Sequence, residues 1–396
     1  MTIKEVARLA GVSPAAVSRY LNGGPLSKEK KECIARAIEE TGYRPNLMAK
    51  TMRTGKVRQV GIIVPRIFSE SVNQVMDGIT EELLEKDYLT VLGYAERNKD
   101  RELQYLEMMQ SNRVAGIILM ATTLSDIKRL SLEKCSVPLV ITGQNFDGFP
   151  CVYHDDKGAV KELTSLMIAK GRKKIVYIGV FEDDKAAGLA RREGVQEALR
   201  EAGFDADQLP IVIADFDTRS GYTCMIGLLE KYPDLDGVIC ATDIIAHGAM
   251  YALKERGKRI PEDVSIAGVG DNWADLVSMP KLTTAHLYHK RCGSEAARML
   301  LKMIGEAGQK SGEEGKPAGA GEPAEAEMSG TAGSAAATGE QPFEAGNPVT
   351  AGEPAVWGKS VDKTAAENSG AASSGKDRKN TDHIKLGYRI IERESL

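Results

Sequence analysis

The chain has 396 residues, 27% of them charged, and a formal net charge of −4. It is long enough for more than one domain, and no apolar run reaches the roughly 20 residues of a transmembrane helix. The six cysteines show no CxxC pair and no metal-ligand spacing, which excludes a disulfide framework and a zinc site and predicts buried free thiols.

Charge is distributed unevenly along the chain. The first 58 residues hold 12 Lys and Arg against 5 Asp and Glu, whereas the remainder holds 40 against 51. A basic head on an acidic body is typical of a small domain that contacts phosphates and is joined to a larger domain. The charge pattern therefore predicts a nucleic-acid-binding domain at the N-terminal end.

The first predicted elements are two short helices joined by a glycine turn. Thr2 and Glu5 form a capping-box pattern for the first helix, which Gly11 can close in a left-handed conformation. Ser13 and Pro14 supply the N-cap and the first position of the second helix. Small residues at its start and an arginine one turn later suit the major groove of DNA. The candidate DNA contacts of this hairpin are Thr2, Ser13, Pro14, Ala15, Ala16, Ser18, Arg19 and Asn22.

A third helix is predicted over residues 28–41, with Ser27 as its N-cap and Gly42 as its stop. Residues 43–45 break the chain, and residues 46–54 form one more short amphipathic stretch. A segment this short is marginal as an isolated helix in water. We therefore expect this stretch to depend on a partner for its folding.

From residue 58 onward, apolar runs alternate with stretches of helical periodicity. Continuous apolar strands with crossover helices predict parallel sheets that are covered on both faces. The pattern occurs twice, which indicates two Rossmann-like lobes with a ligand site at the carboxyl ends of their strands. The predicted strands are 60–64, 89–93, 116–120, 139–142, 174–179, 211–214, 237–241 and 264–269.

Four motifs give the chain a resemblance to the lac repressor family of bacterial transcription regulators. They are residues 6–13 (VARLAGVS), 42–46 (GYRPN), 53–55 (RTG) and the terminal strand from Leu386 to Ser395. The resemblance implies an α helix-turn-helix DNA-binding head and a two-lobed α/β effector domain of the periplasmic-binding-protein type, with parallel sheets. It places the head at 1–45, a hinge helix and linker at 46–57, and the sugar-binding and dimerisation domain at 58–304 plus 384–396.

The remaining segment, residues 305–383, is rich in Gly, Ala, Glu and Pro and contains no Leu, Ile or Tyr. Such a composition buries too little apolar surface to order a chain, so we predict a disordered insertion. Loop closure grows only logarithmically with length, so the insertion costs the fold little.

The resemblance also implies how the hinge acts. In the family, the matching segment folds on operator DNA, pairs with its dimer mate and wedges an apolar side chain into the minor groove. Met52 stands at the wedge position, where leucine is usual, and Asn46 and Ala49 are further candidate DNA contacts. The recognition helix departs from the family at Ala16, which replaces a threonine, whereas Arg19 is retained as the candidate reader of a guanine.

The side chains that follow the predicted strand ends are of the types that bind sugars: carboxylates, amides and guanidinium groups for hydroxyls, and aromatic rings. Arg191 and Asp271 fall where the family places a hydroxyl-binding arginine and a ligand-contacting aspartate. We expect Asp156 and Asp243 instead to cap the helices that follow them. The candidate effector contacts are Arg66, Phe68, Ser69, Gln144, Asp155, Arg191, Thr242 and Asp271.

Within the family, residues 62–67, 152–159 and 175–180 look most like the trehalose- and sucrose-operon repressors. In the trehalose subgroup an arginine after the first strand faces a sugar phosphate, and Arg66 occupies that place. Two cleft arginines would suit an anionic effector, because a guanidinium fork matches phosphate. A neutral sugar stays open as the alternative.

These observations predict a homodimer that binds pseudo-palindromic double-stranded operator DNA and represses a carbohydrate-utilisation operon until a sugar or sugar phosphate binds. The alternative is a catabolite-control regulator whose corepressor is a phosphorylated carrier protein. A transport protein does not fit the DNA-binding head, and an enzyme lacks a nucleophile–base or metal constellation. We therefore expect no catalytic residue, metal or cofactor, no membrane contact, and a cytoplasmic, nucleoid-associated location.

Overall fold

The computed structural model describes residues 2–21, 23–43, 57–123, 126–313, 360–363, 367–368 and 382–396. The predicted contacts Asn22, Asn46, Ala49 and Met52 therefore lie outside the described residues. Among the described helices, none is long and apolar enough to cross a membrane.

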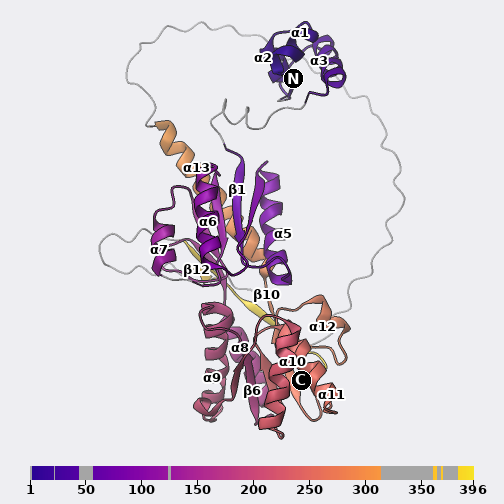
Figure 1. The fold of residues 1–396 in the computed structure, drawn as a ribbon, viewed down its shortest axis with the longest axis vertical. Coiled ribbons are helices and arrows are strands. Elements are labelled where there is room, and N and C mark those ends of the chain that lie inside the picture. Colours follow the sequence, from indigo (N-terminus) through magenta and orange to yellow (C-terminus); the bar gives the residue numbers. More distant parts are fainter. Residues whose placement is uncertain are drawn as a thin grey trace, which may run out of the picture.

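The head consists of three helices: α1 (Ile3–Leu9), α2 (Pro14–Leu21) and α3 (Lys28–Thr41) (Figure 1). The capping box of Thr2 and Glu5 is confirmed. Gly11 and Gly42 have φ of 64° and 59°, so both predicted glycine stops are confirmed. All three helices contribute to one small core, made of Val6, Ala7, Ala16, Val17, Ile34 and Ala37.

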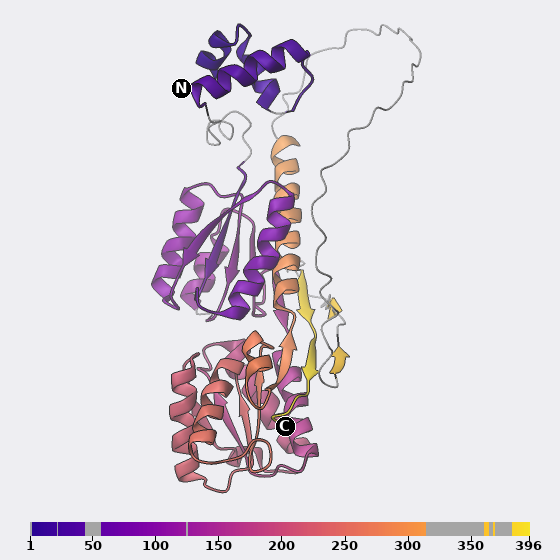
Figure 2. The ribbon, with the colours of Figure 1, turned by 90° about the vertical axis from the view of Figure 1, so that its right-hand side faces the viewer.

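The first lobe is a seven-stranded sheet in the order β12-β13-β5-β4-β3-β1-β2, parallel except for β12. Its main strands are β1 (Gln59–Val64), β2 (Leu89–Tyr94), β3 (Gly116–Met120), β4 (Leu139–Thr142) and β5 (Cys151–His154). Helices α5 (Glu70–Glu85) and α13 (His289–Glu313) pack on one face, and α6 (Lys99–Ser111) and α7 (Asp126–Glu133) on the other (Figure 2). Alternate residues of each strand therefore enter opposite cores, as Ile62 and Ile63 do.

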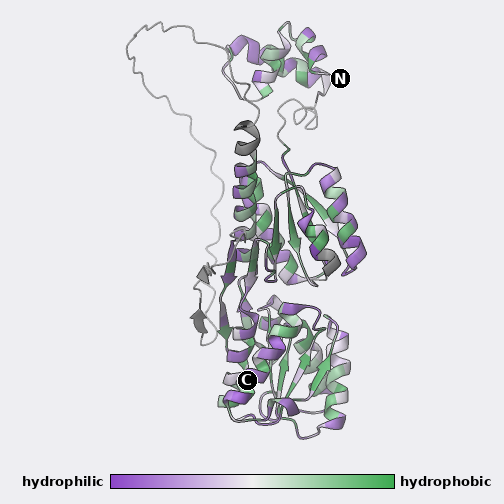
Figure 3. Cartoon of the chain, turned by 90° about the vertical axis from the view of Figure 1, so that its left-hand side faces the viewer, coloured by the Kyte–Doolittle hydropathy of each residue, from purple (hydrophilic) through white to green (hydrophobic). Residues whose placement is uncertain are grey.

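The second lobe repeats this plan in the order β11-β14-β10-β9-β8-β6-β7. Its main strands are β6 (Ile175–Gly179), β7 (Ile211–Ile213), β8 (Gly237–Cys240), β9 (Ser265–Val269) and β10 (Thr283–Leu287). Two helix pairs flank the sheet, α8 (Asp156–Ala169) with α9 (Arg191–Glu201), and α10 (Thr218–Lys231) with α11 (Asp243–Glu255). Shorter elements are η1 (Lys185–Ala190), η2 (Ala206–Gln208) and α12 (Trp273–Val277). Hydrophobic residues gather on the strands and the inner helix faces of both lobes (Figure 3).

The chain passes between the lobes three times. It leaves the first sheet from β5 into α8, returns from β10 into α13, and passes again from β13 (His383–Leu386) to β14 (Tyr388–Ile391). Both sheets carry the strand order 2-1-3-4-5 of doubly wound folds. Ligands bind such sheets where the order reverses, between β1 and β3 and between β6 and β8 here.

All eight predicted strands are present within one residue at each end, so the predicted fold class is confirmed. The prediction of an insertion without order over 305–383 differs from the structure. Helix α13 continues to Glu313, and β11 (Ser360–Lys363) and β12 (Glu367–Asn368) pair antiparallel with β14 and β13. Pairing at an open sheet edge uses backbone groups, which composition alone does not reveal.

Candidate functional site

The second helix of the head presents the predicted DNA-reading surface. Pro14, Ala15 and Arg19 are exposed on α2, and Ser18 is half-buried. The Ser13 hydroxyl caps the helix by accepting a hydrogen bond from the amide of Ala16 at 3.2 Å. The side chain of Ala16 packs in the head core together with Val17, and its predicted contact with DNA stays a prediction.

A cavity of about 480 Å³ lies between the two lobes. Its walls come from the segments that follow the carboxyl ends of β1, β3, β6 and β8, which are the reversal points of the two sheets. The ends of β4 and β5, the segments after β7 and β9 and the start of α13 complete it. The volume lies in the range typical of small-molecule sites. The predicted position of the ligand site between the lobes thus coincides with a cavity.

Arg191 and Asp156 form a buried ion pair at the floor of the cavity. The Arg191 Nε and Nη2 atoms lie 2.8 and 2.7 Å from Asp156 Oδ1, and Nη1 donates to the carbonyl of Ala241. Arg191 begins α9 directly after η1, a π-helical turn of the kind common at functional sites. A buried ion pair joined by several hydrogen bonds fixes both side chains in place. Their remaining edges can therefore meet hydroxyl groups in a fixed geometry.

Arg66 lies across the cavity on the first lobe. Its guanidinium carbon is 4.0 Å from the centroid of the Phe216 ring, which belongs to the second lobe. Burial, together with the neighbouring charge of Arg97, lowers the pKa of Arg66 to about 10. Among the described residues, no carboxylate lies within 4.0 Å of this guanidinium, and its Nε atom has no hydrogen-bond partner. Arg66 is thus a half-buried cation that its described neighbours leave without an ion pair.

Asp184 occupies the second-lobe wall. Its carboxylate caps η1 by accepting the amides of Ala186 and Ala187 at 3.2 and 3.0 Å, and it accepts Gln144 Nε2 at 3.2 Å. Burial raises the pKa of Asp184 to about 6. The acceptance of Gln144 joins the lobes, because Gln144 follows β4 of the first sheet.

Two aromatic rings stand exposed at the cavity, one from each lobe. Phe68 follows β1 and is 96% exposed, and Trp273 opens α12 and is 69% exposed. Both can cover the apolar face of a ring-shaped ligand.

Five of the eight predicted effector contacts line the cavity: Arg66, Phe68, Ser69, Arg191 and Thr242. Gln144 lies behind the wall, where it donates to Asp184 and to the carbonyl of Thr122. Asp155 and Asp271 do not line the cavity either. The structure therefore brings together residues from the segments that follow the reversal-point strands.

The predicted helix cap is shifted by one residue at two pairs of neighbours. Asp155, predicted as an effector contact, caps α8 by accepting the amide of Gly158 at 3.1 Å, whereas Asp156, predicted as the cap, lines the cavity. Thr242 caps α11 by accepting the amide of Ile245, and Asp243, predicted as that cap, is fully buried. In both places the cap precedes the helix by one residue more than predicted. The next side chain consequently points inward.

Titratable and aromatic cavity residues that the sequence did not single out as effector contacts include His154, Asp184, Phe216, His247 and His289. The rings of His154 and His289 meet edge to face, with centroids 4.9 Å apart, where β5 and α13 cross between the lobes. His154 directly ends β5, and this strand-end position was the available signal. Among the described residues, no group of three or more His, Cys, Asp or Glu side chains could hold a metal ion.

A three-helix basic head and a two-lobed domain with a cavity between its lobes define a ligand-responsive DNA-binding regulator. Residues 2–46 match the bacterial regulatory proteins of the lacI family, and residues 58–318 match the periplasmic binding proteins and sugar binding domain of the LacI family. The chain therefore belongs to the lacI family of bacterial transcription regulators, as its motifs predicted.

Curated relatives agree with this assignment. The regulator RegA of Clostridium saccharobutylicum is 34% identical over 306 residues, covering 76% of this chain and 92% of that protein. The sucrose operon repressor of Staphylococcus xylosus is 30% identical over 302 residues, covering 76% and 93%. The catabolite control protein A of Priestia megaterium is 29% identical over 307 residues, covering 77% and 92%.

Solved structures show the same fold. The lac repressor dimer bound to operator and the anti-inducer ONPF has a TM-score of 0.71 at 20% identity, covering 77% of this chain and 93% of that one. The complex of the regulator CelR with cellobiose has a TM-score of 0.64 at 23% identity, covering 100% of each chain.

Proposed function

We propose that this protein is a homodimeric repressor of a carbohydrate-utilisation operon, released from its operator when a sugar phosphate binds between the lobes. The observation that carries the proposal is the cavity, whose fixed polar groups and exposed aromatic rings come from both lobes. Polar groups at set positions orient a polyhydroxylated ligand, while apolar surface supplies contact area. A ligand that contacts both walls favours the closed lobes over the open ones.

The charge of the cavity favours a phosphorylated sugar over a neutral one. Asp156 already neutralises Arg191, whereas Arg66 has no ion pair among the described residues. A phosphate would meet the guanidinium of Arg66 through two parallel hydrogen bonds, which a single hydroxyl cannot match. The sequences of relatives named for sucrose and other sugars support the carbohydrate class.

Exposed apolar surface supports the dimer. Leu89, Val91 and Leu92 stand 47%, 38% and 49% exposed on β2, which is the open edge of the first sheet. A second apolar group follows α12 on the other lobe, with Met279 86% exposed. An open strand edge with apolar side chains is an association site rather than a stable free surface. A second copy that covers both places would position two heads for the two halves of a pseudo-palindromic operator.

The test is binding of the full chain to DNA from its own upstream region at fixed salt, titrated with trehalose, sucrose, fructose and their phosphates. Arg19→Ala provides the control for specific DNA binding, since it removes the exposed guanidinium of α2. We expect release by a phosphorylated sugar and its loss in Arg66→Ala. The matched control is Arg101→Ala, which removes an exposed arginine of the same lobe and should respond as the wild type does.

Other outcomes are informative. If a neutral sugar releases the DNA and Arg66→Ala does not change this release, the proposed phosphorylated effector is contradicted. The proposed function as a sugar-responsive repressor then still stands. Indifference to all these sugars, with tighter DNA binding when a phosphorylated carrier protein is added, would instead establish the catabolite-control regulator.

A further inference from the structure

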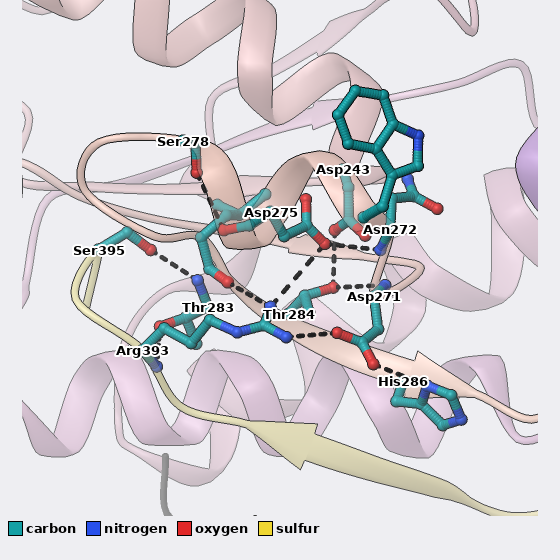
Figure 4. Close-up of polar contacts among 12 residues, drawn as sticks. Asp243, Asp271, Asn272, Asp275, Ser278, Thr283, Thr284, His286, Arg393 and Ser395 are labelled. Atoms are coloured by element: carbon teal, nitrogen blue, oxygen red, sulfur yellow. Dashed lines mark hydrogen bonds and ion pairs between the residues drawn. The ribbon is translucent and has the colours of Figure 1, made fainter. Parts of the chain in front are cut away.

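The segment that follows β14 returns to the wall of the cavity. Ser395 fixes this tail to the second sheet, because its hydroxyl accepts the amide of Thr283 at 2.8 Å and donates to the carbonyl of Ile266 at 2.7 Å. The amide of Ser395 donates to the carbonyl of Lys281 at 3.1 Å. The tail is thus held like an added strand beside β9 and the start of β10 (Figure 4).

This anchoring places the buried guanidinium of Arg393 at the back of the cavity wall. Its side chain is 5% exposed. Its Nη2 atom donates to Asp271 Oδ1 at 2.5 Å, and Nη1 donates to the carbonyl of Leu282 at 2.8 Å and lies 3.9 Å from Asp275 Oδ2. One side chain therefore connects the turn after β9, the helix α12 and the segment before β10 (Figure 4).

Residues 269–275 are divided between the cavity and the tail. Gly270, Asn272 and Trp273 line the cavity, whereas Asp271 and Asp275 turn their carboxylates away from it toward Arg393. Asp275 also accepts the amide of Asn272 at 2.7 Å, and its other oxygen lies 2.7 Å from Nε2 of His247, which lines the cavity too. The geometry of the wall is therefore set by the two carboxylates behind it.

The backbone of this wall needs to be held. Asp271 has φ of 57°, a left-handed conformation that is uncommon for a residue other than glycine. Three contacts fix it: its amide donates to Thr284 Oγ1 at 3.3 Å, and its carboxylate meets Arg393 and Nδ1 of His286, the latter at 3.0 Å. Such conformations persist where the surroundings over-determine them.

The charges behind the wall make Arg393 more important for its position than the other contacts of Asp271. Asp243 and Asp275 are fully buried, the side chain of Asp271 is 17% exposed, and the three lie together behind the wall. Among the described residues, Arg393 is the permanently charged cation that reaches two of them. Removing a partner of buried carboxylates leaves uncompensated charge in a poorly solvated place.

We propose that Arg393 is a positioning residue of the effector cavity: it holds Asp271 and Asp275, and through them the wall formed by residues 270–275. The consequence for effector affinity rests on the proposed function, whereas the positioning of the wall does not. The tail, more than 100 residues from this wall in sequence, is thereby part of the binding site.

The test compares Arg393→Met and Arg393→Lys in the full chain by hydrogen exchange. We expect the amides of residues 270–278 to exchange about tenfold faster in Arg393→Met, the size expected for losing a hydrogen bond between charged groups. Arg393→Lys keeps the positive charge but lacks the two parallel donors of the guanidinium, so it should recover part of the protection from exchange. It also replaces the methionine variant in the test if that variant does not fold. The control is Glu394→Ala, which removes a tail carboxylate that accepts from the amide of Lys281 and should leave residues 270–278 unchanged.

Unchanged exchange at residues 270–278 in Arg393→Met would overturn the proposal. So would equal acceleration in that segment and in β8, because that result describes a general loss of stability. In the functional experiment, sucrose, trehalose and their phosphates are titrated into the complex of the protein with its operator. Arg393→Lys should lower the affinity for any sugar that releases the DNA about tenfold and leave the operator affinity without sugar within about twofold. If no sugar acts on the wild type, the proposed function fails, and the exchange result still decides the role of Arg393.

Discussion

Arg191 and Asp156 show how one buried pair organises the cavity floor. Both are less than 9% exposed, and the guanidinium uses three of its donors on Asp156 and the carbonyl of Ala241. Such a pair contributes little net stability compared with apolar residues, but its components depend on each other strongly. The floor is therefore rigid only while both are present.

Arg191→Met should lower the free energy of unfolding by about 3–5 kcal/mol, because it leaves the carboxylate of Asp156 buried without a counter-charge. Urea denaturation measures the loss. The double variant with Asp156→Asn should recover part of it, since no charge then remains buried. A loss in the double variant equal to the sum of the single losses would contradict this coupling.

Asp184 predicts a pH dependence of stability. Burial raises its folded pKa from 3.8 to about 6, so the folded state holds a proton that the unfolded state has lost between these values. The contribution of Asp184 to stability is therefore present below pH 4 and is lost as the pH rises through 6. In Asp184→Asn the stability difference from the wild type should change by about 2 kcal/mol between pH 4 and pH 7. Denaturation at both pH values measures it, and a constant difference would refute the raised pKa.

At the scale of elements, the turn η1 depends on a glycine. A Cβ at Gly188 would lie 2.1 Å from the carbonyl oxygen of Phe181, which is backbone and cannot turn aside. Gly227 in the middle of α10 has no heavy atom within 4 Å of the same position. The two glycines thus separate a packing requirement from helix propensity.

Gly188→Ala should destabilise the protein by about 2 kcal/mol or more and weaken effector binding, because η1 must move away from the cavity wall. Gly227→Ala should instead stabilise it by up to about 1 kcal/mol, the usual gain of alanine in a helix. Thermal unfolding of both variants tests the contrast, and equal effects would show that the contact at Gly188 relaxes freely.

Local patterns predicted elements better than they predicted side-chain directions. The apolar runs of β1 and β3 and the caps of the head depend on neighbours within a few residues, which the sequence displays. The edge strands β11 and β12 depend on an open partner strand far along the chain. The shift of the cap from Asp156 to Asp155 depends on where α8 begins, and a shift of one residue rotates a helix face by about 100°. The contact of Arg393 with Asp271 joins residues 122 apart, which no local pattern contains.

For the whole molecule, the relation between the lobes is set by few contacts besides the three crossings. Arg97 of the first lobe lies 3.6 Å from Asp215 and within 6 Å of the rings of Phe181 and Phe216 in the second lobe. Lys99 adds a contact to Asp183 at 3.4 Å. All are at least partly exposed, so each contributes about 1 kcal/mol or less. Opening of the lobes would break these contacts together with those of Gln144 with Asp184 and of Arg66 with Phe216.

Arg97→Ala should favour open lobes, since it removes an ion pair and two ring contacts at once. The ligand-free variant should show a larger radius of gyration by small-angle scattering. Its effector affinity should fall about fivefold, because the ligand then works against a smaller closed population. High salt should reduce the difference, as the ion pair is exposed. Arg101→Ala, whose partner Glu96 lies in the same lobe, should change neither quantity. An unchanged radius with unchanged affinity in Arg97→Ala would mean that the crossing strands alone determine the spacing of the lobes.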